Sequence, residues 1–358
     1  MTIPLRMKGV HLIGHGGLDQ LIYKEDIPIP QPSAGEVLIQ VKAAGVNNTD
    51  INTRLGWYSK KITSDTNAQD LDSSLAEQDG SWTGTPLQFP RIQGGDICGN
   101  IVEVGHGVST DRIGSRVLVR SMQNNPNSPD RFAMQTMGSE RDGGFAEYCV
   151  APAHESFDVH SNWTDVELAS TPISYSTAEG MLCRADIQKE KILITGASGG
   201  VGSAAIQLAK IRGATIIAQC SQDKSSALKD LGASQTVARN DNLVEKLGAN
   251  SIDAVIDLVG GKQWPQILDI LKPGGKYVTS GAIAGPIVDL DLRSLYLKDL
   301  TLYGSTVNDP YVFERMIQFI EKGQIKPLVS QTFPLKDIRK AQTVFMEKKF
   351  VGKLVLIP

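Results

Sequence analysis

One glycine-rich stretch contains the residues best suited to chemistry, because its backbone is able to hold a phosphate group. A short apolar run at 192–194 precedes it, and apolar residues at helical spacing continue from 204 to 209. Glycines let the chain turn tightly and approach a pyrophosphate, while the start of the helix offers unpaired N–H groups to that anion. The residues of this loop are Ala197, Ser198, Gly199, Gly200, Val201 and Gly202.

The predicted strand, glycine turn and helix form the context that a dinucleotide-binding fingerprint requires. A glycine-rich junction between a strand and a helix, without any ligand, would read much the same. A second apolar run at 215–218 follows at the distance expected for the next strand of a binding unit. This third element favours the dinucleotide interpretation.

The residues beyond the second strand bear on which dinucleotide would bind. NAD-binding proteins usually place an Asp or Glu there, which bonds the ribose 2′-OH and repels a 2′-phosphate. Here the strand tip carries Ser221 and no carboxylate, Lys224 follows, and Arg239 comes after the third predicted strand. We therefore expect NADP, with these three residues near its 2′-phosphate. Asp223 leaves NAD open as the alternative, and both cations could be ordinary solvated charges.

The segment ITGASGGVGSAAIQLAK at 194–210 resembles the nucleotide loop of the medium-chain dehydrogenase/reductase superfamily. The tripeptide Gly45-Val46-Asn47 is similar to the G-V-N of its zinc-free quinone oxidoreductase branch, which includes zeta-crystallin. The likeness extends over nearly the whole chain, apart from polar insertions. It implies an α/β fold, in which a Rossmann domain with a doubly wound parallel sheet is joined to a β-rich GroES-like catalytic domain.

The same resemblance predicts that the chain holds no metal. Zinc-dependent relatives bind the catalytic ion through a cysteine, a histidine and a second cysteine, and these positions are Asn47, Gly95 and Ile173 here. Catalytic zinc needs three protein ligands and an open position. The segment 120–144, where those relatives often carry a structural zinc lobe, contains no cysteine, and the five histidines lack metal-binding spacing.

A hydride acceptor that does not depend on a metal is a conjugated one, such as a quinone or an α,β-unsaturated carbonyl. The charge then spreads to a distant oxygen that a few hydrogen-bond donors are able to hold. Asn47 is the first candidate for such a donor, and Tyr58 and Tyr175 are candidates to donate a proton or to orient the substrate. Both tyrosines could instead be packing residues. The resemblance further implies cofactor contacts at Thr177, Val259, Gly260, Ser280, Gly281, Ser305 and Thr306.

Other functions remain open. A 2-enoyl thioester reductase, or another alcohol dehydrogenase-like oxidoreductase, would share the nucleotide loop. A thioester reductase would also need basic residues for a phosphopantetheine tail, and Arg54, Lys60 and Lys61 are available. A non-catalytic NADPH-binding structural or regulatory protein is the alternative from another class, and NADPH binding without any turnover would favour it.

The elements that position these residues alternate along the middle of the chain. Strand-like and helical stretches follow one another from 189 to 305, which predicts a parallel, doubly wound sheet with its ligand at the carboxyl ends of the strands. The predicted strands are 191–195, 214–219, 234–238, 252–258, 275–280 and 300–305. The predicted helices include 200–211, 224–231 and 262–271.

The two ends of the chain predict a second, β-rich part. Residues 1–57 are rich in strand-like patterns. The tail adds amphipathic helices at 311–322 and 336–348, and it closes with a strand at 350–356.

We expect the GroES-like catalytic domain to comprise 1–160 and 309–358, and the Rossmann domain to comprise 161–308. Residues 59–90 are polar and lack periodicity, so we expect a long surface insertion there. Its aromatic residues indicate either a cover over the substrate cleft or a loop that is pinned by its own side chains.

Bulk properties limit the partners. The 358 residues are 41% hydrophobic, and a net charge of −3 gives no reason to expect nucleic acid or an anionic membrane as a partner. No apolar run approaches the ~18 residues of a spanning helix, and the start lacks a secretory signal. Four cysteines without paired spacing indicate a reducing compartment, so we expect a cytoplasmic protein. By analogy with the family we expect a homodimer formed through 296–305.

Overall fold

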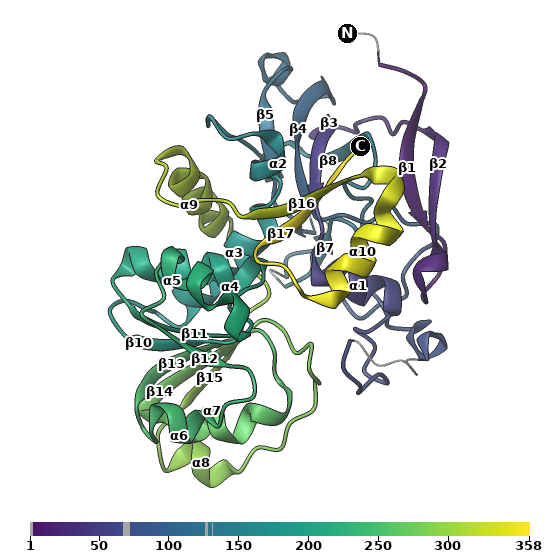
Figure 1. The fold of residues 1–358 in the computed structure, drawn as a ribbon. Coiled ribbons are helices and arrows are strands. Elements are labelled where there is room, and N and C mark those ends of the chain that lie inside the picture. Colours follow the sequence, from purple (N-terminus) through teal and green to yellow (C-terminus); the bar gives the residue numbers. More distant parts are fainter. Residues whose placement is uncertain (1–2, 67–71, 126–127, 131) are drawn as a thin grey trace.

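The computed structural model describes residues 3–66, 72–125, 128–130 and 132–358. Two β-sheet layers lie beside each other, and each has its own helices (Figure 1). The predicted α/β class is confirmed. No helix in these ranges combines the length and the apolarity that are needed to cross a membrane.

One layer is the parallel sheet that the middle of the chain predicts. In the described ranges it has six strands, in the order β12-β11-β10-β13-β14-β15. Strand β10 lies between β11 and β13, so two half-units diverge from it, as in doubly wound nucleotide-binding sheets. The strands are β10 (Lys191–Ile194), β11 (Thr215–Cys220), β12 (Gln235–Ala238), β13 (Ile252–Asp257), β14 (Leu271–Thr279) and β15 (Thr301–Gly304).

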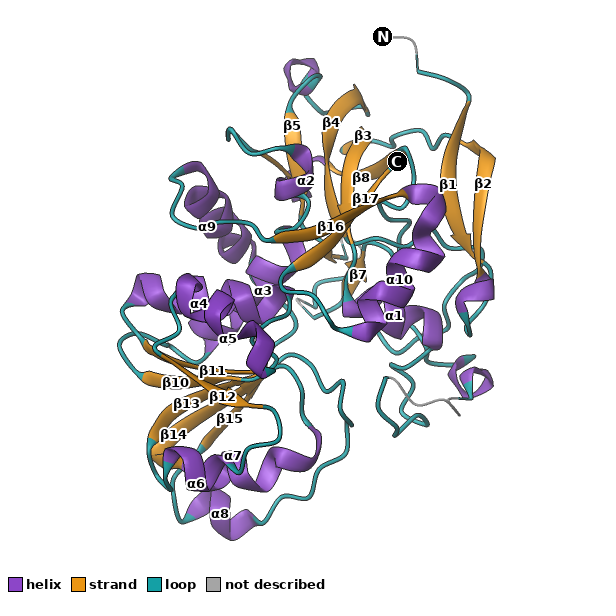
Figure 2. Cartoon of the chain, in the orientation of Figure 1, coloured by secondary structure: helices purple, strands orange, loops and turns teal. Residues whose placement is uncertain are grey.

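Helices cover both faces of this sheet (Figure 2). The central strands are therefore buried from both sides, which explains why their sequences read as unbroken apolar runs. The helices of the parallel sheet are α3 (Pro172–Arg184), α4 (Gly200–Arg212), α5 (Ser225–Leu231), α6 (Leu243–Leu247), α7 (Trp264–Ile270) and α8 (Leu292–Tyr296).

The second layer is a mostly antiparallel sheet. Its strands run in the order β16-β17-β3-β4-β5-β9 within the described residues, and β8 also pairs with β3. The register of β3 and β4 sets Gly45 opposite Asp96, which brings the ends of these two strands together. The strands are β3 (Glu36–Gly45), β4 (Asp96–Val104), β5 (Arg116–Val119), β8 (Tyr148–Pro152), β9 (Ser156–Asp158), β16 (Val329–Pro334) and β17 (Lys353–Ile357).

Short elements complete this second part. Helix α1 interrupts the predicted β-rich start, because Asn47 and Asp50 form a capping box that begins a helix directly after β3. Two hairpins are β1 (Arg6–Leu12) with β2 (Leu21–Pro28), and β6 (Met122–Asn124) with β7 (Met134–Thr136). The remaining helices are α1 (Asn48–Leu55), α2 (Asp165–Leu168), α9 (Pro310–Glu321) and α10 (Ile338–Glu347).

The tail returns to the second sheet, where β17 lies between β16 and β3. We therefore propose that the domains divide as predicted, at about 160 and 308. Several predicted boundaries were wrong, and the largest error is at β14, which was expected from 275 and begins at Leu271. The strand expected from 350 begins only at Lys353, because Gly352 adopts a left-handed conformation (φ 84°). The helix expected to reach 271 ends at Ile270, because Leu271 pairs with Ile252 in the sheet.

The predicted insertion at 59–90 is held at several points, although its residues 67–71 lie outside the described ranges. Ser59 Oγ donates to Leu75 O (3.2 Å) within the insertion. Thr66 N donates to Ile283 O (3.1 Å), so the insertion reaches from the second layer to the parallel sheet.

Candidate active site

The glycine loop follows β10 and leads directly into α4, as predicted. A Cβ at Gly202 would lie 2.5 Å from Ala197 Cα and from Gly196 O, so only glycine lets the helix pack this closely against the turn. A Cβ at Gly199 would meet no atom nearer than Gly196 O at 3.5 Å among the described residues. The loop therefore has one packed glycine and one glycine that faces open space.

These two glycines give a matched pair of variants. Gly202→Ala is expected to lower both the melting temperature and the affinity for dinucleotides, because backbone atoms must move to admit the methyl group. Gly199→Ala is expected to keep the melting temperature and to lose dinucleotide affinity alone, since its methyl group would fill the space that an anion needs. Thermal unfolding and NADPH titration of both variants decide this, and unchanged NADPH affinity of Gly199→Ala would contradict the assignment.

The closing strand of the second sheet lies against this loop. Gly352 N donates to Ser198 O (2.9 Å), and the next residue is Lys353. The side chain of Lys353 crosses the start of α4, where a Cβ at Gly200 would lie 2.6 Å from Lys353 Cδ. The two halves of the chain therefore meet at the predicted anion site.

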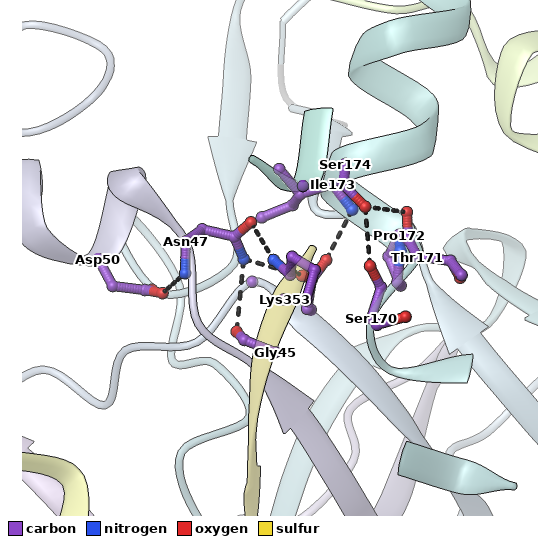
Figure 3. A network of polar contacts seen from close by, with 12 residues as sticks. Gly45, Asn47, Asp50, Ser170, Thr171, Pro172, Ile173, Ser174 and Lys353 are labelled. Atoms are coloured by element: carbon purple, nitrogen blue, oxygen red, sulfur yellow. Dashed lines mark hydrogen bonds and ion pairs between the residues drawn. The ribbon is translucent and has the colours of Figure 1, made fainter. Parts of the chain in front are cut away.

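The ammonium of Lys353 ends in a buried polar network (Figure 3). Its Nζ donates to Asn47 Oδ1 (2.5 Å) and to Asp96 Oδ2 (2.7 Å). Asn47 Nδ2 donates to the same carboxylate oxygen (2.9 Å) and to Gly45 O (3.3 Å). Asp96 Oδ1 accepts from Ile173 N (2.6 Å), so α3 also fixes the network.

This geometry corrects the predicted role of Asn47. An ammonium only donates hydrogen bonds, so the amide oxygen must face Lys353 and the amide nitrogen must face Asp96. Both N–H groups of the amide are then used within the protein, and neither is left for a substrate. Lys353 instead has three N–H donors, of which Asn47 and Asp96 take two.

The three positions that correspond to zinc ligands lie around this network. Asn47 presents an amide there, and Gly95 presents no side chain. A Cβ at Gly95 would lie 2.8 Å from Ile173 Cδ1 and 2.7 Å from Ser121 Oγ, so neighbouring side chains fill the place of a histidine. No group of three or more His, Cys, Asp or Glu side chains in the described ranges is arranged to hold a metal. This donor set does not fit a catalytic zinc ion.

A second carboxylate lies beside the network. Asp50 is buried and accepts from Asn47 N (2.8 Å) through Oδ2. Burial raises the pKa of Asp50 to about 7, and the charge of Lys353 only partly opposes this effect. Asp50 therefore holds its proton to a higher pH than an exposed aspartate does.

Ile173 also forms part of the wall of a small cavity of about 20 Å³. Apolar side chains from both halves line it, with Thr177 from α3 at the predicted nicotinamide position. Trp82, from the insertion, is also part of its wall. The remaining lining residues are Arg120, Ser121, Met122, Ser176, Asn308 and Phe313. A wider surface hollow of about 750 Å³, lined by Arg116 and His160 among others, contains none of the residues of the candidate site.

The two candidate tyrosines have different surroundings. The Tyr175 hydroxyl donates to Lys326 O (2.8 Å) and accepts from Gln207 Nε2 (2.8 Å), so it packs within the core and the structure does not bring it to the network. Tyr58 follows α1 and stacks on Trp82, with ring centroids 5.6 Å apart. Burial raises the pKa of both phenols, so neither is suited to giving up a proton at neutral pH.

The predicted phosphate-recognition residues lie at the end of β11. Lys224 is buried, and its Nζ donates to Lys348 O (2.6 Å) and Phe350 O (2.9 Å). It therefore ties the C-terminal segment to the parallel sheet and is not a solvated charge. A hydrogen bond with Ser221 lowers the pKa of Asp223.

Lys348 joins these cations. Burial lowers the pKa of Lys348 to about 7, and repulsion from Lys353, Arg239 and Lys224 adds to the effect. Its Nζ donates to Asn48 Oδ1 (2.8 Å), which is a neutral partner. In the described part of the chain, no ion pair includes Lys224, Arg239 or Lys348. Such a group of cations is suited to bind an anion.

The other predicted contacts lie at the carboxyl ends of the strands. In the sheet, Asp257 pairs with Thr279 and Thr279 with Gly304, so the loops that follow share one edge. The carboxylate of Asp257 accepts from Val259 N (3.0 Å) and Gly260 N (3.2 Å), which fixes the turn after β13. The predicted residues at this edge are Val259, Gly260, Ser280, Gly281, Ser305 and Thr306.

Sequence reasoning missed Lys353, Asp96 and Lys348. The sequence contains one feature that could have indicated Lys353, because this charged residue begins an otherwise apolar closing strand. Asp96 and Lys348 come together with the site only through the register of β3 and β4 and through the path of the tail. No local pattern in the sequence marks either one.

Comparisons with known proteins agree with this architecture. The family model for the alcohol dehydrogenase GroES-like domain matches residues 33–161, and the model for the zinc-binding dehydrogenase domain matches 200–322. A solved putative alcohol dehydrogenase from Sinorhizobium meliloti 1021 is 45% identical, with a TM-score of 0.89 over 99% of this chain and 98% of its own.

Curated relatives are more distant but span the full length. The quinone oxidoreductase of Rattus norvegicus is 25% identical over 98% of both chains. The acryloyl-coenzyme A reductase of Metallosphaera sedula is 26% identical over 98% of this chain and 99% of its own. The chain therefore belongs to the medium-chain dehydrogenase/reductase superfamily, in its quinone oxidoreductase branch, and is an oxidoreductase of that nicotinamide-dependent family.

Proposed function

We propose that this protein is an NADPH-dependent, zinc-independent reductase of quinones or α,β-unsaturated carbonyls. The observation that carries the proposal is the network of Lys353, Asn47 and Asp96 at the place where zinc-dependent relatives hold their metal. It supplies a positive charge and no metal ligand set. A conjugated acceptor, whose developing charge lies on a distant oxygen, is the substrate class that suits such a site.

The loop and the cations fit NADP. Gly199 leaves open the space that a pyrophosphate would take at the start of α4. Lys224, Arg239 and Lys348 would lie around the 2′-phosphate, since their charges gather at the end of β11 with no ion-pair partner in the described residues. When bound, NADPH would supply the hydride.

The residues of the chain then have separate tasks. Lys353 would donate its third N–H to the acceptor oxygen as negative charge develops there, while Asn47 and Asp96 hold its ammonium in place. Ile173 and Trp82 would exclude water from the reacting atoms. Reduction requires a proton as well as a hydride. We assign that proton to bulk water, which the reduced acceptor would meet once it leaves the closed site, because the buried tyrosines hold theirs.

Steady-state turnover tests the proposal. Purified protein is expected to oxidise NADPH with at least one member of a panel of quinones and enones, and prior treatment with a strong zinc chelator is expected to leave kcat unchanged. An alcohol dehydrogenase that uses zinc, assayed in parallel, serves as the control for chelation. Loss of turnover after chelation, or turnover with simple alcohols only, would contradict the proposal.

A thioester reductase is the second candidate, because the acryloyl-coenzyme A reductase is similar over its full length. The structure removes one of the basic residues that were expected to hold a phosphopantetheine tail. Arg54 is buried, with Nε donating to Gln342 Oε1 (2.8 Å) and an Nη donating to Gly16 O (2.5 Å). It is therefore unable to receive a phosphopantetheine tail, although Lys60 and Lys61 are exposed. Turnover with a short enoyl-coenzyme A, and none with quinones, would favour this candidate.

We also propose a homodimer in a reducing compartment, the cytoplasm. The edge strand β15 pairs only with β14 in the described sheet, and apolar side chains beside it are exposed, with Leu297 at 70% and Tyr296 at 62%. The cysteines are unpaired thiols. Sedimentation equilibrium is expected to give the mass of two chains, and Leu297→Asp the mass of one. A wild-type protein of single-chain mass would contradict the dimer.

A further inference from the structure

Trp82 has a position that the family resemblance does not explain, because it comes from the insertion at 59–90. Its side chain is part of the wall of the cavity beside Ile173 and Thr177. Ile173 connects this cavity to the polar network, since its backbone N–H bonds Asp96. The insertion therefore supplies part of the wall of a cavity that shares Ile173 with the polar network.

The indole is held firmly in this position. It stacks on Tyr58 at 5.6 Å with an interplanar angle of 27°, and Tyr58 in turn lies edge-on to Trp57 at 6.0 Å. Trp82 N donates to Ser139 Oγ (3.3 Å). The next residue, Thr83, is bonded to Glu140 through N (3.1 Å) and Oγ1 (2.9 Å), so the surrounding chain is fixed as well.

The rest of the lining indicates a neutral ligand. Met122, Ile173 and Phe313 are apolar. Arg120 is the charged group of the lining, and the Glu155 carboxylate balances its charge: Nε and Nη2 bind that carboxylate at 2.6 and 2.5 Å, and Nη1 donates to Asn308 O (3.1 Å). A charged ligand would find no unbalanced opposite charge there and would lose its hydration.

The size of the cavity is the decisive quantity. A volume of about 20 Å³ is close to the space of a single water molecule and far below that of an aromatic ring. A planar acceptor would therefore enter only if part of this wall moved, and Trp82 is the part of the wall that the insertion supplies. We propose, resting on the proposed function, that Trp82 sets the upper size limit for the planar, neutral acceptor and thereby determines the specificity of the enzyme.

The test compares acceptors of increasing width, namely 1,4-benzoquinone, 1,4-naphthoquinone and 9,10-phenanthrenequinone. Trp82→Ala is expected to raise kcat/KM for the three-ring quinone relative to the one-ring quinone by about tenfold or more, because truncation opens the wall. Trp82→Phe is expected to retain most of the wild-type preference. Trp163→Phe, a substitution outside this cavity, is the matched control and is expected to change neither value.

A binding measurement separates this inference from the proposed function. The same quinones are titrated calorimetrically into each variant in the presence of NADP⁺, so that no turnover is needed. The inference is supported if Trp82→Ala lowers the dissociation constant of the wide quinones, relative to that of the narrow one, more than Trp163→Phe does. This holds even if no acceptor is reduced. An unchanged ratio of dissociation constants between wide and narrow quinones would overturn it, whether or not the enzyme turns over.

Discussion

Lys353→Met is expected to lower kcat with a quinone or enone acceptor by about 100-fold or more. Removing one preorganised donor to a developing oxyanion typically has an effect of that size. The variant also leaves the carboxylate of Asp96, which has no exposed surface, without its cation. Breaking a buried ion pair costs about 3–5 kcal/mol of stability, so the melting temperature is expected to fall as well.

Two further variants separate catalysis from stability. The double variant Asp96→Asn/Lys353→Met removes both charges and is expected to recover much of the melting temperature but not kcat. Lys353→Arg retains a cation and is expected to recover part of kcat. A Lys353→Met protein that keeps kcat and changes only the KM for NADPH would contradict the role proposed here. It would assign Lys353 to the phosphates of the cofactor instead.

Lys348→Met is expected to weaken NADPH binding by about 10- to 100-fold and to leave NADH binding nearly unchanged. The reason is that a charge-assisted contact to phosphate contributes about 1.5–3 kcal/mol, and NADH lacks the 2′-phosphate. The melting temperature of the free protein is not expected to fall, because the substitution removes a cation that Lys353, Arg239 and Lys224 repel. Equal losses for NADPH and NADH would contradict this assignment.

The pH dependence of NADPH binding follows from the same residue. The pKa of Lys348 is about 7 in the free protein, lower than in a solvated lysine, and a bound phosphate dianion would raise it. Binding would therefore take up a proton above pH 7. The affinity is expected to be constant below pH 7 and to fall by up to about tenfold per unit above it. Titrations between pH 6 and pH 9 check this, and Lys348→Met serves as the control, since it is expected to lose the dependence.

The sequence was sufficient to predict the parallel sheet and its loop, because both depend on local patterns. The strand at 191–194 is buried from both sides and so appears as an apolar run, and Gly202 is required by a close backbone contact. The GroES-like, β-rich part was predicted mainly from the family resemblance, because the alternation of apolar and polar residues in its strands is weaker. The boundaries that failed, at Gly352 and Leu271, depend on a left-handed residue and on a long-range strand pair.

The polar network was beyond sequence reasoning for a different reason. Asn47 was recognised as a site residue, but its hydrogen bonds depend on Asp96 and Lys353, which lie 49 and 306 positions away. These contacts turn an expected substrate donor into a residue that orients another group. Tyr175 differs in that it was proposed for the site but does not contact the network. It lies on helix α3, which borders the site, yet its hydroxyl donates to Lys326 O.

The most direct test of the account is side-by-side titration of the purified protein with NADPH and NADH, with its metal content measured by elemental analysis. We expect tight NADPH binding, much weaker NADH binding and no stoichiometric zinc, because the cations Lys224, Arg239 and Lys348 are suited to hold a 2′-phosphate while Asn47, Gly95 and Ile173 offer no ligand set. Equal binding of the two dinucleotides would contradict the cofactor assignment. One zinc ion per chain would contradict the proposed chemistry.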